Sequence, residues 1–274
     1  MTGAQWSVLR HDQTLQLDAL QASFTTHAFA RHWHDYSVIG LVGTGAQTFW
    51  CRRDTHHTPG GGLILLNPGD AHTGEVAAGG HGFTYRALYP TAGHLAALMA
   101  ELGRPAALPS FPAVRVDDAE LAAELWQLHD DLGGGAPPIA RETRWLGVLA
   151  ALVARYSDER LALPAAGAEP QAVARARAYL HAHAAEPVTL AALAREVGLS
   201  PFYLVRAFRR AVGLPPHTYL DSVRVRRAQE LIAAGSPLAE VAYAVGYSSQ
   251  SHFTTRFRRI LGVTPGRYRE ALLP

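Results

Sequence analysis

Five arginines in one short segment near the end of the chain can neutralise an anionic partner. The segment, VGYSSQSHFTTRFRRILGVTPGRYR (residues 245–269), contains these arginines and no acidic residue. Like charges at helical spacing repel one another, so a solvated helix normally carries both signs of charge. An uncompensated basic face therefore requires either a polyanionic partner, such as a nucleic acid or an anionic membrane surface, or a solvent that tolerates the charge.

The charge of the chain is divided unevenly between two parts. Residues 171–274 carry 14 arginines and 6 acidic residues, a net charge of +8, whereas residues 1–170 carry 11 arginines and 17 acidic residues, a net charge of −6. The length of 274 residues is enough for about two domains. The asymmetry predicts a nucleic-acid-binding or membrane-surface domain joined to a domain with a different task.

Three features of the composition bear on the compartment. The single cysteine, Cys51, cannot form an intramolecular disulfide, which suits a reducing compartment. Residues 1–13 lack the apolar core of a signal peptide. The apolar run at residues 146–154 is about half as long as a bilayer-spanning helix. We therefore expect a cytoplasmic protein with no membrane segment.

The basic part contains one sequence unit twice. Residues 190–219 and 238–268 share a Val-Gly pair, the triplet Phe-Arg-Arg, and a later Gly, Pro and Tyr, at an offset of 48 or 49 residues. Agreement over so many positions indicates an internal repeat rather than chance.

Each unit has the pattern of a helix, a sharp turn and a second helix. Apolar residues of the first copy follow the i, i+3, i+4, i+7 spacing of a packed helix: Leu190, Leu193, Ala194 and Val197. Gly198 is predicted to end this helix, and Ser200 to cap the next one, with Pro201 at its first position. Gly246 and Ser248 are predicted to take these places in the second copy. Such a pair is a helix-turn-helix, whose second helix enters the major groove of DNA. An ordinary helical hairpin is the alternative, and the repeated Arg-Arg disfavours it.

At these residues the chain resembles a known family. The pattern Gly-Tyr-x-x-Gln-Ser-His-Phe-x-x-x-Phe-Arg-Arg, followed by Gly-Val-Thr-Pro and Tyr-Arg, resembles the signature of AraC/XylS-type transcription regulators. Leu-Ser-Pro-x-Tyr-Leu-x-x-x-Phe in the first copy fits the same family. The resemblance covers residues 172–268 and implies helix-turn-helix units at about 188–212 and 237–261, joined by a long helix. A helix over residues 217–234 would be about 27 Å long, which is compatible with recognition helices about 34 Å apart on one face of double-stranded DNA.

The resemblance also assigns the contacts to DNA. Arginines late in the second helices are expected to contact phosphates, which sets affinity and salt dependence but carries little sequence information: Arg209, Arg210, Arg256, Arg258 and Arg259. Exposed residues earlier in these helices are expected to contact bases: Phe202, Val205, Arg206, Gln250, Ser251, Thr254 and Thr255. Arg206 can chelate guanine and Gln250 can chelate adenine, whereas Phe202 and Val205 can contact only a thymine methyl group or the sugar. For the two small threonines, phosphate contact is the alternative.

The acidic part changes from β-prone runs to helical patterns. Residues 37–42, 47–51, 63–66 and 83–88 are β-prone, and Gly- and Pro-rich turns separate them at 43–45, 59–62 and 67–70. Short strands at this spacing predict a small antiparallel barrel or sandwich. Two helices are predicted at residues 119–131 and 139–160, from stripes of leucine and other apolar residues. Residues 163–170 have no periodicity and contain two prolines, which is typical of a linker.

Two stretches of the acidic part resemble the cupin motifs, which occur in the sensor domains of many AraC-type regulators. They are His32-Trp33-His34, before the first predicted strand, and Gly62-x5-Pro68-Gly69-x2-His72. Cupin enzymes bind a divalent metal through two His of the first motif, a Glu soon after it, and a later His. Here Val38 and Ile39 occupy the region of that Glu. The resemblance implies that His32, His34 and His72 lie together, either to hold Zn²⁺ or Ni²⁺ with water or to line a ligand pocket without metal.

Further residues are expected to line this pocket: Trp50, Asn67, Glu75, Tyr85 and Arg86. Aromatic walls with a few polar anchors suit a small polar effector. Glu75 or Arg86 can pair with an ammonium or a carboxylate group, although each can also be a surface charge. His56 and His57 are expected in a solvated loop.

The sequence as a whole predicts a multidomain α+β transcription regulator. Residues 1–160 are predicted to form a cupin-like β-barrel with a helical dimerisation segment, residues 161–170 a linker, and residues 171–274 an all-α DNA-binding domain. We expect a homodimeric activator, not an enzyme, that needs no cofactor and binds promoter DNA, a small-molecule effector and RNA polymerase. Two alternatives stay open. One is a metal-dependent cupin enzyme with a DNA-binding tail, which the missing Glu disfavours, and the other is a constitutive regulator whose barrel is only a dimerisation scaffold.

Overall fold

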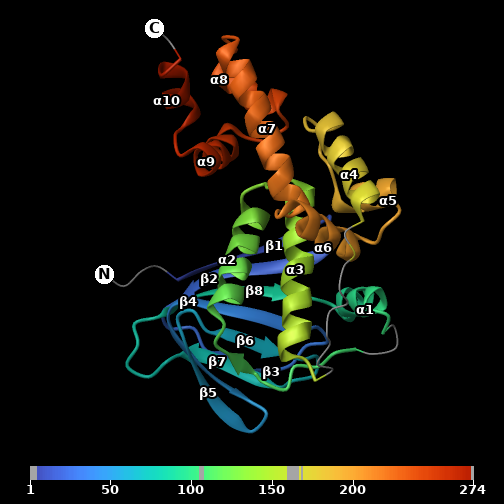
Figure 1. Ribbon diagram of the computed structural model, residues 1–274. Helices are drawn as coiled ribbons and strands as arrows, with labels where there is room; N and C mark the ends of the chain where they lie inside the picture. Colours follow the sequence, from blue (N-terminus) through green and yellow to red (C-terminus); the bar gives the residue numbers. More distant parts are fainter. Residues whose placement is uncertain (1–4, 105–107, 159–166, 168, 273–274) are drawn as a thin grey trace. The chain divides into compact units, whose positions relative to one another are not determined.

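The structure is a computed structural model that describes residues 5–104, 108–158, 167 and 169–272. The chain divides into two compact units, one drawn from residues 1–132 and 144–164 and the other from residues 133–143 and 165–274. The first unit contains the strands and the second contains the run of short helices that follows (Figure 1). The multidomain α+β class is confirmed. Most of the predicted linker at 161–170 lies outside the described residues.

An antiparallel sheet forms the first unit. Six strands follow one another in the order β1–β2–β8–β4–β6–β9, and β4 also pairs with β5 and β7, while β7 pairs with β3. The strands are β1 (Trp6–Asp12), β2 (Leu17–Phe24), β3 (Phe29–His32), β4 (Val38–Cys51), β5 (Asp54–Pro59), β6 (Leu63–Leu66), β7 (His72–Val76), β8 (Phe83–Tyr89) and β9 (Arg115–Val116). Strand β4 therefore connects all the other parts of the sheet.

Strand β4 is longer than predicted, because two β-prone runs form one strand of 14 residues. The segment at 43–45, expected to be a turn, is instead an irregularity in the strand, where the register with β8 shifts between Val42 and Gly45. Gly45 has φ +73°, and a Cβ atom there would collide with the carbonyl oxygen of Gly82. Glycine is therefore required at this bulge, which lets one strand pair with β6 before it and with β5 and β7 after it.

Several strands lie where the sequence predicted none. The prediction of a loop at His56 and His57 is wrong, because both residues belong to β5, which pairs with β4. Strand β2 has the sequence LDALQASF, whose Asp and two Ala residues have low β propensity. Its pairing with β1 and β8 on both edges, rather than local propensity, makes it a strand.

Three helices accompany the sheet: α1 (Ala92–Glu101), α2 (Ala119–Gly133) and α3 (Pro138–Tyr156). The latter two confirm the predicted helices, and in Figure 1 they lie side by side against the sheet. Ion pairs join them, from Arg144 Nε to Asp131 Oδ2 at 2.9 Å and from Arg155 Nη2 to Glu120 Oε2 at 2.8 Å. Their leucine stripes are buried, as Leu121, Leu125 and Leu128 of α2 show.

The second unit contains the helices α4 (Pro170–Ala182), α5 (Leu190–Val197), α6 (Pro201–Val212), α7 (Pro216–Ala233), α8 (Leu238–Ala244), α9 (Gln250–Leu261) and α10 (Pro265–Glu270). Helices α5 and α6 form the first predicted pair, and α8 and α9 form the second. Helix α7, with 18 residues, connects the pairs. Across the described residues, no helix has the length and apolar character needed to cross a membrane.

Glycine and serine fix the turn of the first helix pair as predicted. Gly198 ends α5 with φ +73°, a conformation that glycine adopts at low cost. Ser200 caps α6, because its hydroxyl oxygen accepts a hydrogen bond from the backbone N–H of Tyr203 at 3.3 Å. The turn therefore satisfies a donor that the start of α6 would leave unpaired.

The turn of the second pair differs by one residue. Ser249, not Ser248, caps α9 by accepting a hydrogen bond from the backbone N–H of His252 at 3.2 Å. The hydroxyl of Ser248 donates instead to the carbonyl oxygen of Gly135 at 3.0 Å. The prediction that Ser248 caps the helix is wrong, because the second copy has one more residue in its turn than the first.

A buried arginine joins helix α7 to the loop after α4. Arg224 of α7 is fully buried, and it donates from Nε to the carbonyl oxygen of Ala184 at 2.7 Å and from Nη2 to that of Glu186 at 2.9 Å. Gly246, between α8 and α9, approaches the same loop so closely that a Cβ atom there would lie 2.7 Å from the Ala184 oxygen. The loop after α4 is thus held by α7 and by the turn of the second helix pair.

Candidate functional site

Helix α6 presents arginines on its exposed side. Arg209 and Arg210 are exposed in its last turn, and Arg206 is half-buried one turn earlier. The guanidinium of Arg206 lies 5.3 Å from the ring centre of Phe202, within reach of a cation–π contact. Phe202 itself is only 6% exposed, because its ring packs into the helix pair. The prediction of an exposed base contact at Phe202 is wrong, and Phe202 supports Arg206 instead.

The start of helix α9 presents small and amide side chains. Gln250 is the first residue of the helix and is exposed, as are Ser251 and Thr255, while Thr254 is half-buried. The hydroxyl of Thr255 donates to the carbonyl oxygen of Ser251 at 3.0 Å, so its proton is already engaged. Gln250 is therefore the residue of this helix best suited to a bidentate contact with a base.

Arg256, predicted to contact phosphate, is buried. Its side chain is 9% exposed, and its Nε atom lies 3.1 Å from His252 Nε2 and 3.6 Å from Asp221 Oδ2. Tyr247 donates its hydroxyl to the other oxygen of Asp221 at 3.1 Å, and burial raises the pKa of Tyr247, which keeps that hydroxyl protonated. The prediction for Arg256 is wrong, because this arginine balances a buried carboxylate inside the unit.

The remaining arginines have equivalent positions in the two helix pairs. Arg258 and Arg259 are exposed in the last turn of α9, as Arg209 and Arg210 are in the last turn of α6. Each helix ends at a glycine in the left-handed conformation, with φ near +80°. Both helices thus carry positive charge at the same end, where the helix dipole also favours it.

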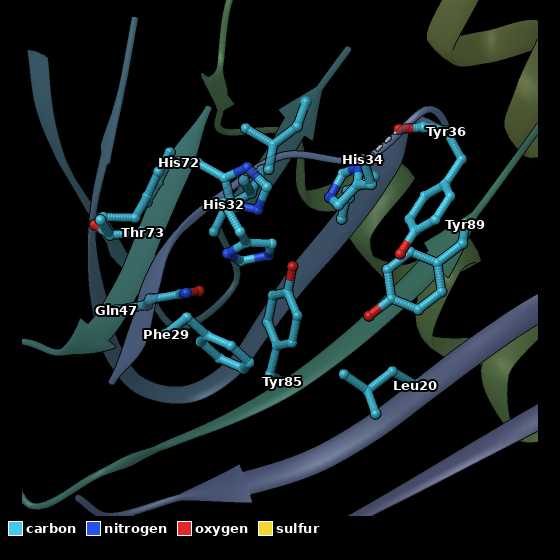
Figure 2. A pocket seen from close by; sticks show the side chains of 14 residues that line it. Leu20, Phe29, His32, His34, Tyr36, Gln47, His72, Thr73, Tyr85 and Tyr89 are labelled. Carbon is cyan, nitrogen blue, oxygen red and sulfur yellow. Dashed lines mark hydrogen bonds between the residues drawn. The ribbon is translucent and has the colours of Figure 1, made fainter. Parts of the chain in front are cut away.

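A cavity of about 100 Å³ lies among the strands of the first unit (Figure 2). Its lining combines aliphatic and aromatic residues with a few polar groups: Leu20, Phe29, His32, His34, Tyr36, Val38, Gln47, Phe49, Ile64, Leu66, His72, Thr73, Tyr85 and Tyr89. None of these lining residues carries a permanent charge. An apolar wall with few polar groups is typical of a small-molecule site.

The three predicted histidines come together in this lining. His32 of β3 is the cross-strand partner of His72 of β7, and His34 follows β3. The ring centres are 4.4 Å apart for His32 and His72, 4.9 Å for His34 and His72, and 5.9 Å for His32 and His34. One ring nitrogen of each lies within 4.8 Å of the others. Strand pairing therefore explains how two motifs 40 residues apart meet.

Backbone carbonyl groups fix the tautomers of these histidines. The Nδ1 atoms of His32, His34 and His72 lie 2.8, 2.9 and 2.8 Å from the carbonyl oxygens of Ala30, Tyr36 and Asp70, respectively. A carbonyl oxygen only accepts hydrogen bonds, so each Nδ1 carries the proton. Each Nε2 is then left with a lone pair. Burial lowers the pKa of His34 and of His72 below the ordinary 6.5, which favours the neutral rings.

Two predicted pocket residues lie away from the cavity because of strand alternation and exposure. Phe49 lines the cavity, so its neighbour Trp50 on β4 points to the other face, where Arg31 lies 3.9 Å from its ring centre. Glu75 on β7 is exposed to solvent. The predictions that Trp50 and Glu75 line the pocket are wrong.

Two others have structural partners. Asn67 accepts a hydrogen bond from the backbone N–H of Phe111 at 2.9 Å and donates to its carbonyl oxygen at 3.0 Å. Arg86 donates to Asp130 at 2.7 Å and lies 3.7 Å from the ring centre of Trp126. The predictions that Asn67 and Arg86 line the pocket are also wrong, because both side chains hold other segments to the sheet. Tyr85, in contrast, lines it.

The sequence did not identify several lining residues. Gln47 and Phe49 share a face of β4, so the period of two in the run 47–51 could have revealed them. Tyr89 lies four residues after Tyr85 on the same face of β8, so the same period could have revealed it, whereas Tyr36 precedes β4 and had no such signal. Tyr36 stacks on His34 with ring centres 4.2 Å apart, and burial raises the pKa of Tyr85 and of Tyr89, which keeps these phenols as hydrogen-bond donors.

Comparison with known proteins agrees with this architecture. Residues 14–149 match the model of the AraC-like ligand binding domain, and residues 193–271 match that of a helix-turn-helix domain. The chain is 30% identical over 246 residues to the HTH-type transcriptional regulator YbfI of Bacillus subtilis, covering 89% of this chain and 88% of that protein. It is 26% identical over 260 residues to the HTH-type transcriptional activator RhaS of Salmonella arizonae, covering 92% and 91%. The solved DNA-binding domain of AdpA, in complex with a target DNA, is 32% identical with a TM-score of 0.36, covering 36% of this chain and 90% of that one.

A sheet unit with an internal cavity, followed by two helix-turn-helix pairs with basic helix ends, defines a transcription regulator with a ligand-binding domain. The chain belongs to the AraC-like family of transcriptional regulators.

Proposed function

We propose that this regulator activates transcription in response to a small molecule bound in the cavity of the first unit, without catalysing a reaction. The observation that carries the proposal is the side chain of Gln47, which lines the cavity, is 5% exposed, and has an Oε1 atom without a hydrogen-bond partner among the described residues. An unsatisfied buried acceptor costs about 1–3 kcal/mol. A ligand that donates a hydrogen bond to Gln47 would recover this energy.

The size and lining of the cavity define the kind of effector. Its volume of about 100 Å³ is below the range of about 300–1,000 Å³ for sites of drug-sized ligands. A small metabolite with one polar end therefore fits best. The phenols of Tyr85 and Tyr89 and the hydroxyl of Thr73 supply further hydrogen bonds.

The second unit binds promoter DNA in this proposal. Arg206 and Gln250 contact bases, with smaller contributions at Val205, Ser251, Thr254 and Thr255. The exposed arginines at the ends of α6 and α9 contact phosphates. The distribution of charge supports this division, because residues 171–274 carry a net charge of +8.

The sign of regulation and the partners are also part of the proposal. The relative RhaS is named a transcriptional activator, which supports activation here. We expect a homodimer formed through the helical segment of α2 and α3, and contact with RNA polymerase at the promoter. An effector must bind one conformation of the regulator more tightly than another, since equal affinity shifts no equilibrium.

Thermal shift and DNA binding with a metabolite panel test the effector proposal. A compound at 100 times its dissociation constant should stabilise the protein by about 2.7 kcal/mol and change its affinity for promoter DNA. Gln47→Leu should abolish both effects, while the same substitution at Gln21, in the sheet but outside the cavity lining, should preserve them. If Gln47→Leu responds like the unaltered chain, the effector does not bind in this cavity.

A further inference from the structure

Three histidines in the cavity lining, His32, His34 and His72, each have an Nε2 lone pair that can bind an electron-pair acceptor. Their protons are on Nδ1, where backbone carbonyl groups hold them. One ring nitrogen of each histidine lies close to the others, so a single electron-pair acceptor can bind a lone pair from all three. We propose that His32, His34 and His72 bind one divalent transition-metal ion through Nε2, and that this ion makes the cavity select small anions.

The geometry of the triad is close to that of a three-histidine site. Zinc bonds to histidine nitrogen of about 2.0–2.1 Å place the nitrogens of a tetrahedral site about 3.3 Å apart. The ring nitrogens of the triad lie within 4.8 Å of one another, so the rings must close by about 1.5 Å. His32 is exposed and ends the short strand β3, which leaves its side chain room for this movement and gives the ion a path to the site.

The contacts behind the histidines have the form that metal sites need. A ligating histidine almost always donates its other ring N–H to a carbonyl or carboxylate oxygen, which orients the ring and makes the ligand nitrogen more basic. All three histidines have such a contact to a carbonyl oxygen. His34 is further held by Tyr36, whose ring is stacked on it with an interplanar angle of 5°.

The ligand set defines the class of ion. Imidazole nitrogens suit zinc, nickel, cobalt and copper, whereas magnesium and calcium require oxygen ligands. The three histidines are the only group of this composition found among the described residues, and no carboxylate lines the cavity with them. A divalent transition metal therefore fits and the hard cations do not.

The lining residues include no carboxylate, and this absence favours a negatively charged fourth ligand for the ion. Three neutral imidazoles supply no negative charge to the ion, and the carboxylates of Asp35 and Asp70 act on the histidines only from outside the lining, so the ion still lacks a directly bound anionic partner. An anionic ligand such as a small carboxylate supplies that partner and fits the apolar remainder of the cavity. This step rests on the proposed effector function, whereas metal binding by the triad does not.

Metal binding by the full chain, prepared without a histidine tag, tests the first step. Calorimetric titration with Zn²⁺ and elemental analysis after dialysis should give one ion per chain. His32→Ala, at an exposed position, and His72→Gln should each weaken binding by more than about 100-fold, which exceeds the effect of losing an outer contact. The control His57→Ala removes an exposed imidazole of β5 and should leave binding unchanged. Equal binding by the chain with and without these triad substitutions would overturn the site.

The visible absorption of Co²⁺ tests the anion step. The probes are acetate, propionate and benzoate, each with its neutral amide as a matched control. At least one carboxylate should shift the cobalt absorption and raise the melting temperature of the metal-loaded chain, while the amides and the chelator-treated chain should show no response. If carboxylates act equally with and without metal, the ion does not select the ligand.

The two proposals fail in different ways. If the chain still binds a small molecule and changes its DNA affinity after complete chelation, the effector function is supported and a role of the metal in it is excluded. If the chain binds Zn²⁺ through the three histidines but no small molecule alters its DNA binding, the metal site is supported and the effector function is excluded.

Discussion

Alanine substitution of two arginines of α9 that are only two positions apart should have different effects. One substitution should destabilise the fold, and the other should weaken DNA binding. The side chain of Arg256 is 9% exposed and lies 3.6 Å from the buried carboxylate of Asp221. Arg258 is exposed in the last turn of the same helix. We expect Arg256→Ala to damage the fold and Arg258→Ala to damage only the electrostatic attraction to DNA.

The burial of each side chain determines how strongly its removal changes the unfolding free energy and the DNA affinity. Removing Arg256 breaks its buried ion pair with Asp221, a carboxylate that also interacts with Arg224 and accepts a hydrogen bond from Tyr247, and breaking such a buried pair costs about 3–5 kcal/mol. In a unit of this size each kcal/mol lowers the melting temperature by about 4–8 °C, so a fall of at least about 12 °C follows. Arg258→Ala should change the unfolding free energy by less than about 0.5 kcal/mol. It should reduce the slope of log affinity against log salt by about 0.9, the value of one phosphate contact.

Calorimetry of the full chain and DNA binding over a range of salt concentrations measure the two effects. Arg259→Ala, at the next exposed position of the helix, is the control that should behave like Arg258→Ala. If Arg256→Ala melts with the unaltered chain and lowers the salt slope, then Arg256 contacts phosphate and the argument from burial is refuted.

Three further predictions concern base contacts and pH. Arg206→Ala and Gln250→Ala should each cost about 1–3 kcal/mol on the true operator and little on non-specific DNA, and equal losses on both DNAs in gel-shift titrations would show phosphate contact instead. Burial, together with the charge of Arg86, lowers the pKa of His129 from 6.5 to about 3. The stability from neutral His129 is therefore present above pH 6.5 and is lost as the pH falls toward 3, by up to about 1.4 kcal/mol per pH unit; urea titrations at pH 7 and 5 should show this loss and His129→Gln should reduce it. Burial also raises the pKa of the Cys51 thiol from 9.0 to about 11, so the stability from this thiol should be complete below pH 9 and lost as the pH rises through 11, and iodoacetamide at pH 8 should label the unfolded chain much faster than the native one.

The helix-turn-helix pairs could be predicted closely because their signals are local. The apolar stripe of α5, the glycine after it and the capping serine of α6 act within a few residues of one another. The failures in the same region involve partners distant in sequence. Arg256 is buried because Asp221 is available 35 positions earlier, and no local pattern reveals that pair.

The sheet was less predictable for the same reason. Strand β6 matched its apolar run to the residue, since Leu63–Leu66 is buried throughout. Strand β2 has no such run and depends on pairing with two neighbours. In the cavity, the histidines were found because their motifs specify positions, whereas Trp50 and Arg86 were chosen by residue type alone, and type does not determine which face of a strand a side chain occupies.

In the proposed mode of DNA binding, the loop after α4, held by Arg224 and approached by Gly246, limits how far the two helix pairs can move relative to one another. A rotation of helix α7 about this joint would break two buried hydrogen bonds, and the space beside Gly246 is too narrow even for a Cβ atom. One base pair inserted between the two bound segments moves the second segment by about 3.4 Å and turns it by about 34° around the DNA axis. Two recognition helices fixed in this way would not follow that change, so we expect the spacing of the operator to contribute to its specificity together with its bases.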